Sequence, residues 1–228
     1  MGAIIMKKTF FIYCLSLMVF IAVPSWAADG KALVKSNKCG SCHKMQGPAV
    51  KTIAEVLKRK APDLFYAGSK FNKDWLVKYI QSPTVIRPGG VVYTNNIKLN
   101  GDQDEPANLL KCASKLSAGD AAAVGDYLMS LKDATMKVGV FKKAKIKKAM
   151  ARRVMMKGEA CNACHSFPKR GGGVSCPTFE GIGSRLNPDW MYSFVNHPQK
   201  WDPKVWMAKR DLDDATLQLI VNFLSSMK

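Results

Sequence analysis

The segment Cys39–His43 reads CGSCH, and the segment Cys161–His165 reads CNACH. Both follow the pattern C-x-x-C-H, the signal for covalent attachment of c-type haem. The spacing lets both thiols add to the vinyl groups of one porphyrin, and the histidine then lies below the ring with a nitrogen facing the iron. The sequence therefore predicts two covalently attached haem c groups. The four attachment cysteines are Cys39, Cys42, Cys161 and Cys164. The two proximal iron ligands are His43 and His165.

Other chemistries also use pairs of cysteines at this spacing. A thioredoxin-like redox pair opens a helix within a βαβ unit, and no strand pattern surrounds either motif here. A zinc site needs clustered ligands. If both motifs shared one zinc ion, a histidine directly after each cysteine pair would be an unusual ligand spacing. A disulfide framework does not predict that histidine at all. Haem attachment therefore explains the motifs best.

The N-terminal segment has the pattern of a secretory signal peptide. Lys7 and Lys8 precede an apolar run over residues 10–23, and a small-x-small ending closes at Ala27. Such a segment directs export, whereas a membrane-spanning helix usually needs about 20 apolar residues. An uncleaved anchor is the alternative. We expect residues 1–27 to be removed and the mature protein to lie in the periplasm.

The residues after each motif repeat at a constant offset of 115. The repeated features are a proline, a Gly-Ser pair followed by a basic residue, an asparagine and an Asp-Trp pair. The coinciding positions are Pro62 and Pro177, Gly68-Ser69 and Gly183-Ser184, Asn72 and Asn187, and Asp74-Trp75 and Asp189-Trp190. Such internal similarity predicts one module written twice.

Each copy is predicted to be helical. Asn72 and Asn187 are good N-caps, and the helices that they begin end at Pro83 and Pro198. Apolar residues at i, i+4 spacing line one face of both helices. Final helices are predicted over about residues 118–131 and 213–227. No run alternates as a strand does, so the predicted fold class is all-α.

This arrangement resembles class I cytochrome c, duplicated as in tandem dihaem cytochromes. The resemblance rests on both C-x-x-C-H motifs, the proline and Gly-Ser-basic stretches and the Asp-Trp helices, and it covers nearly all of the mature chain. It implies two tandem class I cytochrome c-like haem domains, with each haem supplying much of its core. We place the first domain at residues 28–132, a basic linker or helix at 133–150, and the second domain at 151–228.

The resemblance also implies a methionine on the far side of the iron, in the loop before the last helix. In the second domain Met207 occupies that place, five residues before Leu212. The alternative is a core methionine, because the chain contains 12 methionines. His/Met ligation raises the reduction potential. Met207 is therefore the predicted distal ligand of the second iron.

The first domain departs from this pattern, because residues 46–128 contain no methionine. Cys112 lies beside the place that Met207 has in the second domain. Three interpretations stay open: Cys112 ligates the iron as a thiolate, Cys112 forms a disulfide with Cys176, or Lys111, an outside methionine or nothing fills the distal position. Thiolate ligation would lower the potential of the first haem relative to the second.

The chain is strongly basic, with 35 Lys and Arg against 17 Asp and Glu and a net charge of +18. Residues 132–157 carry ten of these cations. Ile146, Met150 and Val154 recur every four residues, which predicts a helix with one apolar stripe. Its basic face is either simply solvated or docks an acidic redox-partner protein. Peripheral contact with anionic lipid is a weaker candidate, and no nucleic acid is expected.

These features favour a periplasmic dihaem cytochrome that transfers electrons between redox partners over an enzyme, because no general acid, base or substrate pocket is evident. The alternative is a haem enzyme. With Cys112 on the first iron, the chain is somewhat similar to dihaem thiosulfate dehydrogenases, and it would oxidise a small sulfur anion there. A haem sensor or peroxidase with a vacant first iron is the third hypothesis.

Overall fold

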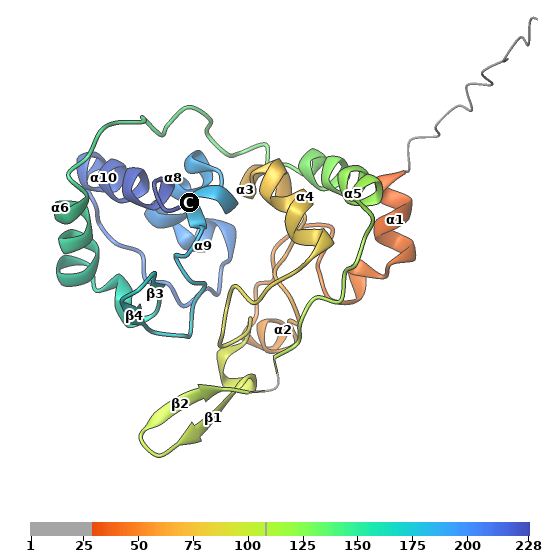
Figure 1. Ribbon diagram of the computed structural model, residues 1–228, viewed down its shortest axis with the longest axis horizontal. Helices are drawn as coiled ribbons and strands as arrows, with labels where there is room; N and C mark the ends of the chain where they lie inside the picture. Colours follow the sequence, from red (N-terminus) through yellow and green to blue (C-terminus); the bar gives the residue numbers. More distant parts are fainter. Residues whose placement is uncertain (1–28, 108) are drawn as a thin grey trace, which may run out of the picture.

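The computed structural model describes residues 29–107 and 109–228, which form two helical halves side by side (Figure 1). The first half spans residues 29–131, the second spans residues 148–228, and a long connection joins them. The predicted signal peptide lies outside the described residues. Among the residues that are described, no helix has both the length and the apolar character needed to cross a membrane.

The first half is built around α5, against which α1, α3 and α4 pack. Its elements are α1 (Gly30–Ser36), η1 (Cys39–Ser41), α2 (Ile53–Leu57), α3 (Ala67–Lys70), α4 (Lys73–Gln81), η2 (Tyr93–Asn95), β1 (Ile97–Asn100), β2 (Gln103–Pro106) and α5 (Ala118–Ser130). The Ser117 hydroxyl caps α5 by accepting the Asp120 N–H at 3.1 Å. Ala121, Val124 and Leu128 recur at helical spacing and form the buried face of α5.

The second half is built in the same way around α10, against which α6, α7 and α8 pack. Its elements are α6 (Lys148–Arg153), a π-helical turn η3 (Val154–Gly158), η4 (Cys161–Ala163), β3 (Ser166–Phe167), β4 (Gly171–Gly172), α7 (Ile182–Arg185), α8 (Pro188–Asn196), α9 (Pro198–Trp201) and α10 (Asp214–Ser225). The helices α3 and α4 begin and end 115 residues before α7 and α8. The sequence repeat is therefore also a repeat of local structure.

The two halves meet through reciprocal backbone hydrogen bonds. The Asn72 N–H donates to the carbonyl of Arg185 at 3.0 Å, and the Asn187 N–H donates to the carbonyl of Lys70 at 2.9 Å. Phe71 and Leu186, which lie between these residues in each half, form an antiparallel β-bridge. The two donors are equivalent residues of the repeat, and so are the two acceptors, so the contact has the symmetry of a two-fold axis. The contacts of α3 with α8 and of α4 with α7 follow the same symmetry.

An ionic contact reinforces this junction. The Arg59 guanidinium pairs with Asp63 of its own half at 3.1 Å and with Asp202 of the other half at 2.5 Å. Nearby, the rings of Tyr66 and Trp201 lie 5.2 Å apart across the junction. These side chains are largely buried, so the two halves are joined by packed and paired groups and not only by the connecting chain.

The connection between the halves differs from the prediction. The helix begins only at Lys148, and residues 132–147, which we call the strap, are irregular. The predicted apolar stripe is confirmed only in part: Ile146 and Val154 pack against the core, but Met150 is 57% exposed, and Ala151 and Met155 are the buried residues of this segment.

The strap lies along the second half because side chains there satisfy its backbone. The Asp189 carboxylate accepts the N–H groups of Gly139 and Phe141, both at 2.8 Å. Asn222 of α10 donates to the carbonyl of Lys142 at 2.9 Å and accepts the N–H of Ala144 at 2.8 Å. Backbone groups need such partners when no secondary structure supplies them.

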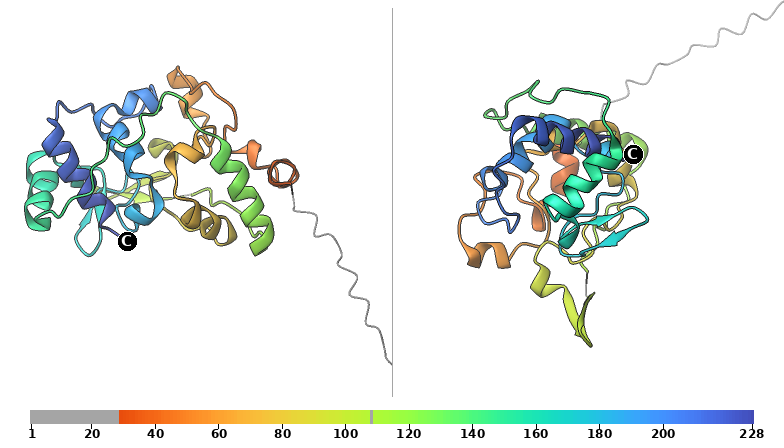
Figure 2. Two further views of the ribbon diagram at one scale, coloured as in Figure 1. Left: turned by 90° about the horizontal axis from the view of Figure 1, so that it is seen from above. Right: turned by 90° about the vertical axis from the view of Figure 1, so that its left-hand side faces the viewer.

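Two short hairpins also differ from the all-α prediction. β1 pairs with β2 in antiparallel fashion, and β3 pairs with β4. The first hairpin projects from the body of the protein (Figures 1 and 2). Leu99 on this hairpin is 73% exposed. Because solvent lies around the hairpin, its sequence shows no apolar alternation that would have revealed a strand.

We predict that Asn222→Ala lowers the free energy of unfolding by about 1–3 kcal/mol, because partly buried backbone groups of the strap lose their partners. Trypsin should then cleave the lysine-rich strap faster than in the wild type. Asn196→Ala is the control, because the Asn196 amide makes no hydrogen bond to the described residues. Equal cleavage rates for both variants would mean that Asn222 does not hold the strap.

Candidate functional site

The two C-x-x-C-H motifs have the same backbone conformation. Each opens with a 3-10 helical turn, η1 or η4. The residue before each turn is left-handed: Lys38 has φ 53°, and Ala160 has φ 50°. In both motifs the histidine N–H donates to the carbonyl of the first cysteine at 3.0 Å. The same turn therefore presents the cysteines and the histidine in each half.

Both histidines are oriented by a backbone carbonyl. His43 Nδ1 lies 2.8 Å from the carbonyl oxygen of Pro62, and His165 Nδ1 lies 2.7 Å from that of Pro177. A carbonyl oxygen only accepts, so Nδ1 carries the proton and Nε2 keeps its lone pair. Burial lowers the pKa of both imidazoles, which favours their neutral form. A neutral imidazole fixed through Nδ1 is a typical metal ligand.

The motif cysteines are poor candidates for a redox pair and good ones for covalent attachment. All six cysteines within the described residues have unpaired thiols. Burial raises the pKa of Cys39, and it raises the pKa of Cys161 to about 11. A redox-active pair instead needs a lowered pKa. No group of three or more His, Cys, Asp or Glu among the described residues could hold a bare metal ion.

These groups fit covalently bound haem c, because each motif offers two free thiols and one imidazole with a free Nε2. Residues 27–132 match the family model described as Cytochrome c. This match supports a c-type cytochrome domain in this part of the chain. It implies a helical class I fold, covalently bound haem c and a role in electron transfer. No curated protein matches the sequence.

In the second half, the loop that carries Met207 is tied to the segment before the motif. Arg210 donates to the carbonyl of Glu159 at 3.1 Å, and its Nε lies 3.8 Å from the Glu159 carboxylate. Gln199 donates to the carbonyl of Met207 itself at 2.8 Å. Glu159 precedes Cys161 by two residues, so the half-buried Met207 lies in a loop held beside the attachment site. Sequence reasoning missed Arg210 and Glu159, because their contact spans 51 residues.

In the first half, Cys112 lies near the motif and is exposed. Burial raises the pKa of Cys39, and the charge of Cys112 adds to that rise. Cys112 also contributes, after burial, to a raised pKa of Tyr79. Cys176 lies at the other motif, where its N–H donates to the carbonyl of Cys164 at 3.1 Å. The two cysteines are therefore associated with different halves and are not joined by a disulfide in this structure.

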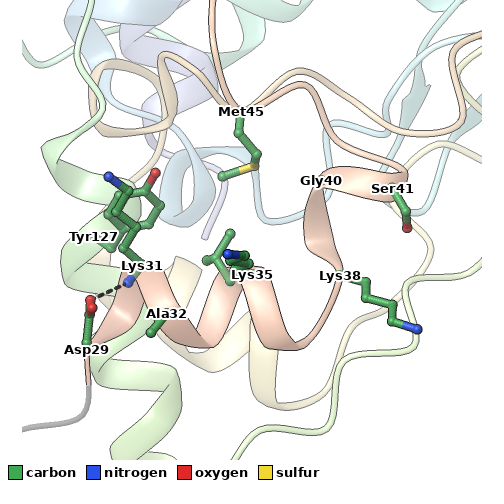
Figure 3. Close-up of a pocket in the computed structure, with 10 residues that line it drawn as sticks. Asp29, Lys31, Ala32, Lys35, Lys38, Gly40, Ser41, Met45 and Tyr127 are labelled. Carbon is green, nitrogen blue, oxygen red and sulfur yellow. Dashed lines mark hydrogen bonds between the residues drawn. The ribbon is translucent and has the colours of Figure 1, made fainter.

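A shallow pocket of about 450 Å³ lies between α1, the first motif and α5 (Figure 3). Met45 reaches toward α1 over it, and Lys35 and Tyr127 also line it. The lining contains neither a cysteine nor a histidine. The pocket therefore offers no thiol or imidazole that could attach haem.

Glycines let the chain after the second motif approach it closely. A Cβ at Gly173 would lie 2.1 Å from the carbonyl oxygen of Ala163 and 2.8 Å from Cα of Cys164. The Gly173 N–H donates to the carbonyl of Asn162 at 2.9 Å. A side chain at this position would push the backbone away from the motif.

We predict that Gly173→Ala lowers the free energy of unfolding of the haem-loaded protein by about 1–3 kcal/mol, because the new methyl group clashes with backbone. Denaturant titration measures this change. Gly158→Ala is the matched control, since its Cβ meets no atom within 4 Å. If both substitutions had the same effect, the close approach at Gly173 would not be a constraint.

Proposed function

We propose that the protein is a periplasmic dihaem c-type cytochrome, built of two tandem class I modules, that transfers electrons between redox partners. The observation that carries this proposal is the equivalence of the two candidate attachment sites. Both have the same turn and the same histidine hydrogen bond to a proline carbonyl. The second half also repeats the helix contacts of the domain that matches the cytochrome c family.

In each module, the cysteines would hold the cofactor through thioether bonds, and His43 or His165 would bind the iron through Nε2. Bound haem c supplies an iron that cycles between the ferrous and ferric states. The Nδ1–H bond to the proline carbonyl fixes the imidazole plane and makes Nε2 a stronger donor. Export through the predicted signal peptide would place the protein where c-type cytochromes encounter periplasmic partners.

The two distal sides differ, which would set the direction of electron flow. Met207 is the proposed distal ligand in the second module, supported by the contacts of Arg210 and Gln199 that position its loop. Cys112 is the proposed ligand in the first module. In support, Cys112 lies close enough to Cys39 for its charge to add to the rise that burial causes in the pKa of Cys39. Thiolate ligation lowers a haem potential and methionine ligation raises it. Electrons would therefore pass from the first module to the second.

The strap and α6 offer a surface for an acidic partner protein. Five lysines there are exposed, and none forms an ion pair with a described residue: Lys142, Lys143, Lys145, Lys147 and Lys148. Complementary charge accelerates encounter while leaving the complex short-lived, as electron transfer requires. Anionic lipid headgroups would be attracted to the same lysines, but less specifically.

Haem counting tests the proposal directly. The purified exported protein should contain two haems per chain, by pyridine haemochrome assay and by intact mass. Replacing Cys161 and Cys164 together by alanine should reduce the count to one, because each motif attaches its own haem. Cys176→Ala should leave it at two. A wild-type count of one would contradict the dihaem function.

The position of Cys112 also supports a second candidate function, oxidation of a small sulfur anion at the first haem. The thiol is exposed beside the first motif, and the neighbouring Lys111 and Lys115 are exposed as well. Cations of this kind would attract an anionic substrate. A substrate could thus reach the distal side of the first module, while electrons leave through the second.

We predict that the EPR spectrum of the oxidised protein contains a low-spin, thiolate-type signal that disappears in Cys112→Ala and persists in Cys176→Ala. An unchanged spectrum in Cys112→Ala would exclude thiolate ligation. Thiosulfate turnover with an artificial acceptor then separates the two functions. Turnover that is lost in Cys112→Ala supports the enzyme, and absence of turnover supports the carrier.

A further inference from the structure

The segment that supports the proximal histidine of the first half is held by the second half. Asp63 directly follows Pro62, whose carbonyl oxygen lies 2.8 Å from Nδ1 of His43. Arg59 pairs with Asp63 at 3.1 Å through one terminal nitrogen. Through the other terminal nitrogen it pairs with Asp202 of the second half at 2.5 Å. The support of His43 is therefore linked to a residue of the other half.

Asp202 begins the loop that carries Met207. Its carboxylate accepts the N–H of Lys204 at 3.3 Å, and its carbonyl accepts the N–H of Val205 at 3.0 Å. Gln199, three residues before Asp202, donates to the carbonyl of Met207 at 2.8 Å. A displacement of Asp202 would therefore move the backbone that leads to Met207.

The ionic bridge is largely buried, so water competes with it only weakly. The side chains of Arg59, Asp63 and Asp202 are 11%, 4% and 17% exposed. Burial raises the pKa of Asp63, the charge of Arg59 lowers it, and the charge of Asp202 raises it again. The two carboxylates are therefore close enough to repel each other when Arg59 is absent. Removal of one partner from a buried ionic group leaves charge without compensation.

The opposite side of the junction has the equivalent arrangement, made by the backbone. Thr178 directly follows the proline whose carbonyl oxygen lies 2.7 Å from Nδ1 of His165. The Thr178 N–H donates to the carbonyl of Ile86 in the first half at 2.9 Å. The Gly89 N–H donates to the carbonyl of Val174 in the second half, also at 2.9 Å. The support of His165 is therefore also held by the other half.

These contacts join equivalent parts of the repeat. Asp63 and Thr178 are separated by the 115-residue offset, and so are Arg87 and Asp202. On both sides of the junction, the segment behind one proximal histidine meets the loop that leads to the terminal helix of the other half, α5 or α10.

We propose that the two candidate haem sites are coupled across this junction, and that Arg59 is the positioning residue that couples the support of His43 to the Met207 loop. This inference rests on the proposed haem in each half and on Met207 as an iron ligand. Arg59 acts through Asp63 on one side and through Asp202 on the other. Movement of the Met207 loop would thus change the support of His43, and the reverse.

Competition for the second iron tests the coupling. The methionine-to-iron charge-transfer band of the oxidised, haem-loaded protein reports Met207 ligation, and added imidazole abolishes the band by displacing the methionine. Arg59→Met should increase the apparent affinity for imidazole at this iron by about tenfold, because the loop loses a charged anchor. Asp63→Asn, which keeps the side-chain shape and lies wholly in the first half, should increase it by about threefold.

Hydrogen exchange tests the reverse direction. The Leu64 N–H donates to the carbonyl of Lys44, the residue after His43, at 2.9 Å. Asp202→Asn, a change in the second half, should accelerate exchange of this Leu64 amide in the first half by about threefold or more, since Asp63 loses its link across the junction.

Ser117→Ala is the matched control for general loss of stability. Ser117 caps α5 in the first half, and its hydroxyl accepts the N–H of Asp120 within that half at 3.1 Å. Its removal destabilises the first half without touching the ionic bridge. Both the imidazole affinity and the Leu64 exchange rate relative to global unfolding should equal those of the wild type.

The outcomes are distinguishable. An unchanged imidazole affinity in Arg59→Met and Asp63→Asn, with two haems per chain, would overturn the coupling and leave the dihaem function intact. An equal effect of Ser117→Ala would assign the change to general destabilisation, which also overturns the coupling. A wild-type spectrum without the methionine band would refute Met207 ligation and the coupling with it. A wild-type haem count of one would refute the dihaem function itself.

Discussion

The hydrogen bond from each motif histidine to a proline carbonyl is the constraint on which each half depends. It fixes the proton at Nδ1 and leaves Nε2 free. It also brings the chain back to the motif after the connecting loop, which sets where α3 and α7 begin. The terminal helices α5 and α10 then close each half by packing on these elements. The residues that hold the imidazole thus also organise the fold.

The symmetry between the halves does not extend to all of their polar side chains. The backbone contacts at the junction are reciprocal, but the charged side chains near them are only partly so. Arg87 and Asp202 stand at equivalent positions of the repeat with opposite charges. Asp202 completes an ion pair with Arg59, whereas Nε of Arg87 is unpaired. A duplicated module can keep its packing while its polar groups diverge, because packing constrains shape and the polar groups select ligands.

The loops before the terminal helices α5 and α10 show the same divergence. Arg210 and Gln199 hold the Met207 loop close to its motif, so this side of the second half is well defined. The corresponding region of the first half contains the projecting hairpin (Figure 1). It also contains Cys112, which is exposed. Such an enlarged and exposed loop is a usual place for a new function, because loops accept insertions without disturbing the packed helices.

The sequence alone determined both motifs, the 115-residue offset and the helices that follow Asn72 and Asn187, because these depend on local chemistry and helical periodicity. Tertiary structure decided the rest. The strap is irregular although its sequence suggested a helix, since Asp189 and Asn222 supply its hydrogen bonds from distant elements. The proton position on each histidine and the ion pair between Arg59 and Asp202 likewise depend on contacts between residues far apart in the chain. No local pattern records such contacts, because only folding brings these groups together.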